Sequence, residues 1–217
     1  MADGDISKDL KAKVRARVGV PGTEGLLDAH IYAFLNRGQY DLAMSLNDAA
    51  LPALCELASG TLTASRVGLP SDFMRLRLVR VGATPVVAKL IKQTELDALA
   101  NNAYYAPTAT NPYYHLWYNA TDAALRLHVE LGDAASVAAY ELYYIKMPTD
   151  MSDTVDPTFA ADLYELLVDY AVKRVRESWE QYDEGVRILE QYARRINTIN
   201  SRARVTAMLN QGPPGNI

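Results

Sequence analysis

The feature that most constrains the fold is a helical spacing of apolar residues through the last third of the chain. Since an α-helix has 3.6 residues per turn, residues at this spacing share one face, which must be buried against other elements. Asp156-Pro157 predicts where this region starts, and Gly185 predicts a break near Asp183 that leaves two helices of about 24 residues, each about 36 Å long. The first apolar stripe comprises Phe159, Leu163, Leu166, Leu167, Tyr170, Val175, Trp179 and Tyr182, and the second comprises Val186, Leu189, Ile196 and Ile199.

Two further helices are predicted near the N-terminus. We expect the first over residues 5–18, with Asp5 or Ser7 as its N-cap, and the second over residues 26–46. In both segments the apolar residues recur at helical spacing among polar ones. The stripes are Leu10, Val14 and Val18 in the first helix, and Leu27, Ile31, Phe34, Leu35, Leu42 and Leu46 in the second.

The middle of the chain is predicted to be β-structure. Met74, Leu76 and Leu78 alternate with arginines, which is the period-two pattern of a strand with one buried face. Val79 and Val81 then fall out of phase with the preceding residues. A shift of one residue predicts a β-bulge at this point of the strand.

Further elements are predicted on both sides of this strand. Residues 51–70 favour a turn followed by a strand, residues 83–93 a β-branched strand, and residues 93–101 a short helix capped by Thr94. Three closely spaced strands follow and are predicted to form a one-sided antiparallel meander. They cover residues 112–120, 124–132 and 136–148; in the middle strand Leu125, Leu127 and Val129 face one way, and Arg126, His128 and Glu130 the other.

Together these patterns predict an α+β fold, a mainly helical bundle with long C-terminal helices and an inserted small antiparallel β-sheet. We expect four parts along the chain. They are N-terminal helices in residues 1–59, a β-rich insertion in residues 60–147, long helices in residues 148–207 and a flexible tail in residues 208–217. The final residues, QGPPGNI, cannot continue a helix.

Charge is unevenly distributed along the chain, whose net charge is −4. Residues 1–20 carry five basic and three acidic side chains, residues 21–185 twelve and twenty-two, and residues 186–217 five and one. An acidic body argues against a general nucleic-acid-binding domain, which needs a dense basic face. Cys55 is the only cysteine, so no intramolecular disulfide can form. A charged N-terminal segment and no long apolar run predict synthesis in the cytosol and no membrane span.

The sequence has no phosphate-binding loop, dinucleotide-binding glycine motif, nucleophile elbow or zinc-protease motif. We therefore expect no enzyme activity, no cofactor and no bound metal. Two alternatives remain open. A hydrolase would need His115 or His128 beside Glu130, although such a pair on a strand is commonly only solvated. A carbohydrate-binding module would use aromatic side chains as a platform, unless these rings only pack over the sheet. The aromatic residues concerned are Tyr104, Tyr105, Tyr113, Tyr114 and Trp117.

Five short motifs follow one another along the chain. LKAKVRARVGVPG is a basic first helix, and the next helix carries an Asn-Arg-x-Gln segment. LPSDFMRLRLVRV leads into the sheet, YELYYIKMP leads out of it, and FAADLYELLVDYAVKRV and EGVRILEQYARRI form a closing pair of helices. In this order the motifs resemble the adaptor, or head-to-tail connector, proteins of tailed bacteriophages. The family-like residues are Asn36, Arg37 and Gln39; Leu69, Pro70, Asp72 and Phe73; and Tyr143, Tyr144, Lys146 and Pro148.

The resemblance implies a structural virion protein located at the neck. It implies a homo-oligomeric ring, a dodecamer, that docks beneath the portal protein, extends the DNA channel and provides the attachment platform for tail or nozzle proteins. Double-stranded DNA would pass without sequence-specific binding, which an acidic body favours because like charges repel phosphates. A tail-completion or nozzle component is the nearest alternative within the phage class.

The C-terminal segment of the family's members often reaches into the portal, and residues 200–217 occupy that position here. The resemblance therefore implies portal docking by basic and apolar residues near this end. A tail that becomes ordered on docking would lose its conformational entropy only at assembly. The docking candidates are Arg202, Arg204, Met208, Leu209 and Ile217. We expect helices 26–46 and 158–207 to pack side by side around the ring, with the β insertion pointing toward the tail or stacking between subunits.

Overall fold

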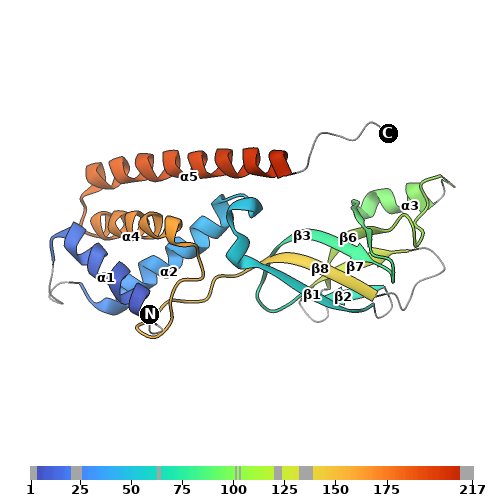
Figure 1. Cartoon of the computed structure of the whole chain (residues 1–217), viewed down its shortest axis with the longest axis horizontal. Coiled ribbons are helices and arrows are strands. Elements are labelled where there is room, and N and C mark those ends of the chain that lie inside the picture. The colour runs from blue at the N-terminus through green and yellow to red at the C-terminus, as the bar shows by residue number, and fades with distance from the viewer. Residues whose placement is uncertain are drawn as a thin grey trace. The chain divides into compact units, whose positions relative to one another are not determined.

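The computed structural model describes residues 4–20, 26–62, 65–100, 102, 104–119, 124–131 and 139–210. The chain divides into two compact units. The helical unit comprises Met1–Leu54 and Met147–Ile217, and the β unit comprises Cys55–Lys146. Helices of the first unit and strands of the second are distinguished in Figure 1. The predicted α+β class is confirmed. None of the described helices is long and apolar enough to cross a membrane.

The helical unit is assembled from both ends of the chain, and α4 is its central helix because α1, α2 and α5 all contact it. Apolar α4 residues such as Leu167, Ala171 and Val175 are fully buried. α2 approaches α4 closely at Gly38, where an added Cβ would lie 3.0 Å from the Tyr170 ring. The helices are α1 (Asp5–Val18), α2 (Asp28–Ser45), α4 (Tyr164–Ser178) and α5 (Tyr182–Asn210), and the short 3₁₀ turns are η1 (Asp48–Ala50), η2 (Pro52–Leu54) and η5 (Ala161–Leu163).

The first turn of α1 is capped from a distant part of the chain. Gly4 occupies the N-cap position, where the sequence predicted Asp5 or Ser7. Ser7 is buried, and its backbone N–H donates to Asp156 Oδ1 at 2.9 Å. The free N–H groups of a first helical turn need such acceptors. Asp156 therefore caps α1 and starts no helix of its own, so the predicted helix start at Asp156-Pro157 is wrong; α4 begins at Tyr164.

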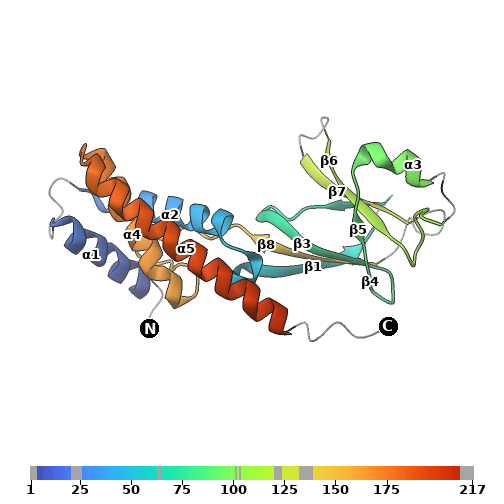
Figure 2. The same ribbon diagram turned by 90° about the horizontal axis from the view of Figure 1, so that it is seen from above.

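A break between the two C-terminal helices is present, and it lies at residues 179–181, slightly before the predicted position near Asp183. Glu180 has a left-handed backbone, with φ 62°, and the Gln181 N–H donates to the Arg176 carbonyl at 2.9 Å. This arrangement ends a helix as a C-terminal glycine would. As a result α4 has 15 residues and α5 has 29. At 1.5 Å per residue α5 is about 43 Å long and α4 about 22 Å, so α5 continues well beyond α4, as Figure 2 shows.

The described residues of the β unit form two four-stranded sheets where the sequence predicted one. Sheet A has the order β1-β8-β3-β4 and sheet B the order β2-β7-β6-β5. Within both sheets the described pairs are antiparallel except for β5 with β6, which are parallel. The strands are β1 (Cys55–Thr61), β2 (Arg66–Gly68), β3 (Phe73–Val81), β4 (Val86–Val87), β5 (Lys89–Leu90), β6 (Tyr113–Asn119), β7 (Ala124–Glu130) and β8 (Ala139–Lys146).

Two of the predicted β elements are corrected by this topology. β8 is not the third strand of a meander beside β7, because it lies between β1 and β3 and hydrogen-bonds with both of them. The strand predicted over residues 83–93 is divided between the sheets, since β4 belongs to sheet A and β5 to sheet B, with the buried Ala88 between them. The helix predicted over residues 93–101 is a 3₁₀ turn, η3 (Gln93–Glu95), followed by α3 (Leu96–Ala100). Lys92, and not Thr94, occupies the N-cap position of η3.

The apolar core of the β unit includes residues from both sheets. The predicted bulge is confirmed, because the register of β3 with β8 shifts between Leu76 and Leu78. After that shift Val79 and Val81 are buried. In β7 the predicted alternation holds from Arg126 to Glu130, where Leu127 and Val129 are buried, and the side chain of Leu125 lies outside the described residues. The buried core residues are Leu62, Val67, Val79, Val81, Ala88, Leu127, Val129, Leu131, Leu142 and Tyr144.

Candidate functional site

The Asn-Arg-x-Gln segment of α2 holds the chain segment that follows β8. Asn36 Nδ2 donates to the Met151 carbonyl at 3.2 Å, and Asn36 Oδ1 accepts from the Met151 N–H at 2.7 Å. Gln39 Nε2 donates to the Thr149 carbonyl at 3.0 Å. Gln39 is fully buried, whereas Arg37 is exposed. Asn36 and Gln39 therefore fix the path of residues 149–151 along α2.

The motifs that lead into and out of the sheet lie side by side, because β3 pairs with β8. The Tyr144 hydroxyl donates to Asp72 Oδ1 at 3.0 Å, and the Tyr144 ring stacks on Phe73 with the centroids 5.9 Å apart. Burial, followed by the hydrogen bond to Asp72, raises the pKa of Tyr144 to about 12. The Pro70 carbonyl accepts from the Phe73 N–H at 3.0 Å, and Leu69 packs against the core. These motif residues thus join two strands.

The remaining residues of the second motif also make contacts within the chain. Lys146 Nζ lies 2.5 Å from Glu56 Oε1, which links β8 to β1. The Tyr143 hydroxyl donates to Glu141 Oε2 at 3.2 Å. Pro148, just after β8, is buried. These contacts indicate that the motif residues serve to hold the folded chain together.

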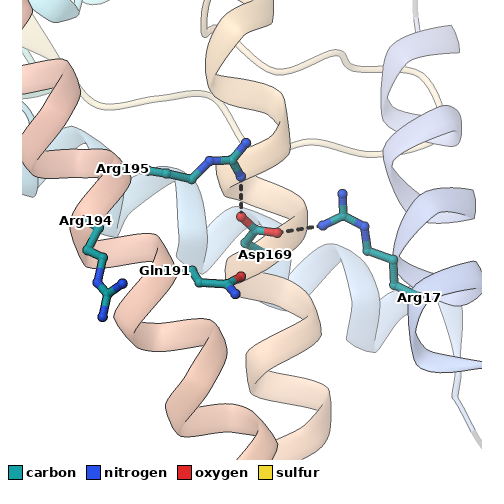
Figure 3. Close-up of a pocket in the computed structure, with 5 residues that line it drawn as sticks. All are labelled: Arg17, Asp169, Gln191, Arg194 and Arg195. Atoms are coloured by element: carbon teal, nitrogen blue, oxygen red, sulfur yellow. Dashed lines mark hydrogen bonds and ion pairs between the residues drawn. The ribbon is translucent and has the colours of Figure 1, made fainter.

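A cluster of charged side chains joins three helices of the helical unit, and Figure 3 shows it. Asp169 of α4 lies between Arg17 of α1 and Arg195 of α5, and each carboxylate oxygen accepts from one guanidinium at 2.6 Å. The Asp169 side chain is only 13% exposed. Gln191 and Arg194 complete the lining of a cleft of about 490 Å³. One carboxylate therefore links α1 to α5 through α4.

A second carboxylate shares the same arginine. Glu165, one turn before Asp169 on α4, pairs with Arg17, and Lys13 Nζ lies 3.6 Å from Glu165. Because these side chains are half-exposed, each ion pair is expected to contribute about 1 kcal/mol or less. The cluster was missed from the sequence because its members lie far apart in the chain and each fits an ordinary solvated helix face.

The chain matches the family model described as SU10 adaptor protein over residues 7–213. The chain belongs to this family. The match extends from α1 into the segment after α5 and confirms the resemblance to phage head-to-tail adaptors that the five motifs predicted. No curated protein matches the chain. Membership makes the chain a structural adaptor of a phage.

The candidate docking residues of the adaptor lie near or beyond the C-terminal end of α5. Arg202 and Arg204 are exposed. Met208 and Leu209 belong to the last turns of the helix, and Ile217 lies outside the described residues. The candidates of α5 are therefore in one continuous helical segment.

Asn200 holds α5 to the N-terminal half of the helical unit just before this segment. Its Oδ1 accepts from the Asn47 N–H at 2.7 Å, and its Nδ2 donates to the Ser45 carbonyl at 3.0 Å. Asn200 also accepts through its own carbonyl from Asn47 Nδ2 at 3.2 Å. This anchor fixes the direction in which the end of the helix projects.

The aromatic residues proposed as a carbohydrate platform do not share one face. Successive residues of a strand point to opposite sides, and Tyr114 packs against the core cluster whereas Tyr113 lies on the other face of β6. Trp117 is on the face of Tyr113, and the Arg66 guanidinium lies 5.1 Å from its ring centroid. Tyr104 is 92% exposed in the segment after α3. The adaptor therefore has separate aromatic groups in place of the platform.

The two histidines of the hydrolase alternative are neighbours on β6 and β7. Their rings stack with centroids 5.1 Å apart and planes within 10°, and His128 Nε2 lies 3.2 Å from Glu130 Oε1. Burial, followed by the charge of His128, lowers the pKa of His115. None of the described residues lining the adjacent cavity carries a hydroxyl or thiol. Among the described parts of the chain no cluster of three His, Cys, Asp or Glu side chains is arranged for a metal ion.

Proposed function

We propose that the chain forms a homo-oligomeric ring, a dodecamer, that docks beneath the portal protein of the phage head. The ring extends the DNA channel and provides the platform to which tail or nozzle proteins attach. Membership of the adaptor family supports this proposal. A closed ring needs two different contact surfaces on each copy, because a self-complementary patch produces a two-fold dimer.

The observation that best supports a contact with the portal is the exposed C-terminal end of α5. The helix is about 21 Å longer than α4 at 1.5 Å per residue, and its C-terminal part continues beyond that neighbour (Figure 1). Beyond Asn200, both arginines are exposed, and Val205 is 56% exposed. A helix end with basic and apolar side chains on its surface suits a groove with acidic and apolar side chains on a partner. This end of α5 is the portal-docking segment.

DNA passage is supported by the charge of the chain. The acidic excess lies in residues 21–185, whereas the basic excess is concentrated in residues 186–217. Phosphates are repelled by an acidic wall, so DNA can slide past it. We place the basic end at the portal contact and an acidic surface along the channel.

Portal docking is tested with two variants, one that lacks residues 208–217 and one in which the charges of Arg202 and Arg204 are reversed. Deleting residues 208–217, or combining Arg202→Glu with Arg204→Glu, should weaken binding to purified portal rings at least about tenfold, since hydrogen bonds to charged groups contribute about 1.5–3 kcal/mol. The matched control is Arg187→Glu, an exposed arginine in the first part of α5. Native mass spectrometry gives the fraction bound. Full binding by both variants would count against docking through this end.

The same measurement tests the ring and separates the nearest alternative. Twelve copies on each portal ring are expected. One or two copies on each portal would contradict a closed ring. A tail-completion or nozzle component would leave the free portal unbound and attach only to necks that already carry their adaptor.

A further inference from the structure

One face of sheet B brings three nitrogen-bearing side chains into a single row. Arg66 of β2 is the cross-strand neighbour of His128 of β7, and His128 is in turn the neighbour of His115 of β6. Residues directly opposite each other in neighbouring strands point to the same side. This row faces away from the core, because the alternate residues Val67 and Leu127 are buried in it. We call it the sheet B row.

The sheet B row lines a cavity of about 270 Å³. Gln93 of η3, Leu96 of α3 and Trp117 of β6 complete the described lining. The lining offers guanidinium, amide and imidazole donors and contains no carboxylate. Glu130 contacts His128 but does not line the cavity. A cavity with a positive charge, several N–H donors and no acid favours an anion over a cation.

His115 is the most deeply buried member of the sheet B row. Its side chain is buried, with 6% of its surface exposed, and its Nδ1 atom has no hydrogen-bond partner within the described structure. Leaving a buried polar atom unpaired costs about 1–3 kcal/mol. The stacked His128 ring fixes the plane of the imidazole. Nδ1 itself is enclosed by the protein, so a ligand in the cavity meets the part of the imidazole ring that lines it.

We propose that the sheet B row binds the phosphate group of a phosphate ester. Arg66 supplies the charged donor, and Gln93 and His115 supply neutral N–H donors to the phosphate oxygens. Leu96 and Trp117 form the apolar wall against which the organic part of the ester lies. The site belongs to the β unit alone, and it does not depend on ring formation or on portal docking.

Other ligand classes fit this cavity less well. A metal ion would meet the Arg66 charge and find no carboxylate in the lining. A sugar bound by ring stacking needs a free aromatic face, whereas the Arg66 guanidinium already lies over Trp117 at 5.1 Å. A phosphate ester uses that guanidinium where it is, because arginine binds phosphate through its N–H groups while its plane rests on an aromatic ring.

The test uses the full chain with inorganic phosphate and with adenosine 5′-monophosphate, titrated at constant ionic strength. Ligand binding is followed by the NMR resonances of His115 and His128 and by calorimetry. Both ligands should shift the two histidines, and the ester should bind more tightly because it also contacts the apolar wall. The Arg66→Gln variant should lose about tenfold or more in affinity for both ligands, since a hydrogen bond to a charged group is removed.

The matched control is Arg80→Gln. Arg80 also lies over an aromatic ring, 5.4 Å from the Tyr143 centroid, but it belongs to sheet A. The Arg80→Gln variant should bind both ligands with the affinity of the unaltered chain. Gln93→Ala, at an exposed position in the cavity lining, serves as a second variant if Arg66→Gln fails to fold, and it should also weaken binding. Unshifted histidines at tens of millimolar phosphate, or equal losses in Arg66→Gln and Arg80→Gln, would overturn the proposal.

Discussion

The helical unit and the β unit use buried polar side chains differently. In the helical unit such side chains connect segments that are distant in sequence. Ser7 receives its cap from Asp156, and Gln39 holds the Thr149 carbonyl. In the β unit the described core residues are apolar apart from the hydroxyl group of Tyr144, with Tyr114 and Tyr140 packed at the edge of the cluster. Among the described residues of the β unit, the buried polar side chain outside this core is His115, on the outer face of sheet B, where it lines a cavity. The helical unit therefore depends on polar contacts for its chain path, whereas the β unit depends mainly on its apolar core.

The largest effect is expected from the apolar core of the β unit. Leu127 is fully buried in it, so Leu127→Ala should lower the free energy of unfolding by about 2–5 kcal/mol through lost burial and a residual cavity. Urea unfolding followed by tryptophan fluorescence and circular dichroism measures this change. Leu116→Ala, at a position that is 42% exposed on the neighbouring strand, is the control and should cost much less. Equal losses would show that the sheets have no tightly packed core.

The second prediction concerns the polar contacts of the helical unit. Gln39→Leu keeps the volume of the side chain but leaves the Thr149 carbonyl without its donor, which should cost about 2 kcal/mol. Limited proteolysis should then cut more rapidly within residues 147–160, since the segment is no longer held to α2. The exposed Arg37→Ala on the same helix should change stability by less than about 0.5 kcal/mol. Unchanged cleavage in Gln39→Leu would contradict the anchoring role.

The third prediction concerns the charged cluster of α1, α4 and α5. Asp169→Asn removes the carboxylate that links Arg17 to Arg195, and it should lower the free energy of unfolding by about 1 kcal/mol. Because the arginines are half-exposed, the loss should shrink in high salt. Glu190→Gln, which affects only an exposed pair at 3.7 Å, is the control and should be nearly neutral. A loss independent of salt would indicate a packing effect.

The smallest effect is expected from the tyrosine that joins the two sheet motifs. Tyr144→Phe removes the hydrogen bond to Asp72 and should cost about 1 kcal/mol at neutral pH. Since the pKa of Tyr144 rises from 10.0 to about 12 on folding, the folded state holds this proton more tightly than the unfolded state. Its stabilising contribution is therefore complete below pH 10 and is lost as the pH rises toward 12. Unfolding at pH 8 and pH 11 should show a smaller alkaline loss in Tyr144→Phe than in the unaltered chain.

Local patterns in the sequence predicted the helices and strands in which buried residues recur at a regular spacing. The helical stripe of Leu10, Val14 and Val18 predicted α1 with its observed bounds, and the change of phase after Leu78 predicted the bulge of β3. Both depend only on neighbours within a few residues. The break after α4 was expected near Asp183 but lies at residues 179–181, because Glu180 adopts a left-handed backbone that the local pattern does not indicate.

Features set by distant contacts could not be predicted in this way. Asp156 resembled the start of a local helix, but its carboxylate accepts a hydrogen bond from the N–H of Ser7, 149 residues away. The strand order depends on which strands meet in space, so the pattern of β8 did not reveal that it pairs with both β1 and β3. The histidines could be placed on the faces of their strands. The cavity that they share with Arg66 and Gln93 could not be predicted, because it depends on the pairing of β2 with β7 and on the position of η3.

The central claim is that the chain is a structural part of the phage neck that joins the head to the tail. The most direct test is electron microscopy of particles assembled without the chain and of particles to which the purified chain is then added. The account predicts heads without tails in the first sample and tailed particles in the second. Intact necks and attached tails in particles that never contained the chain would contradict it.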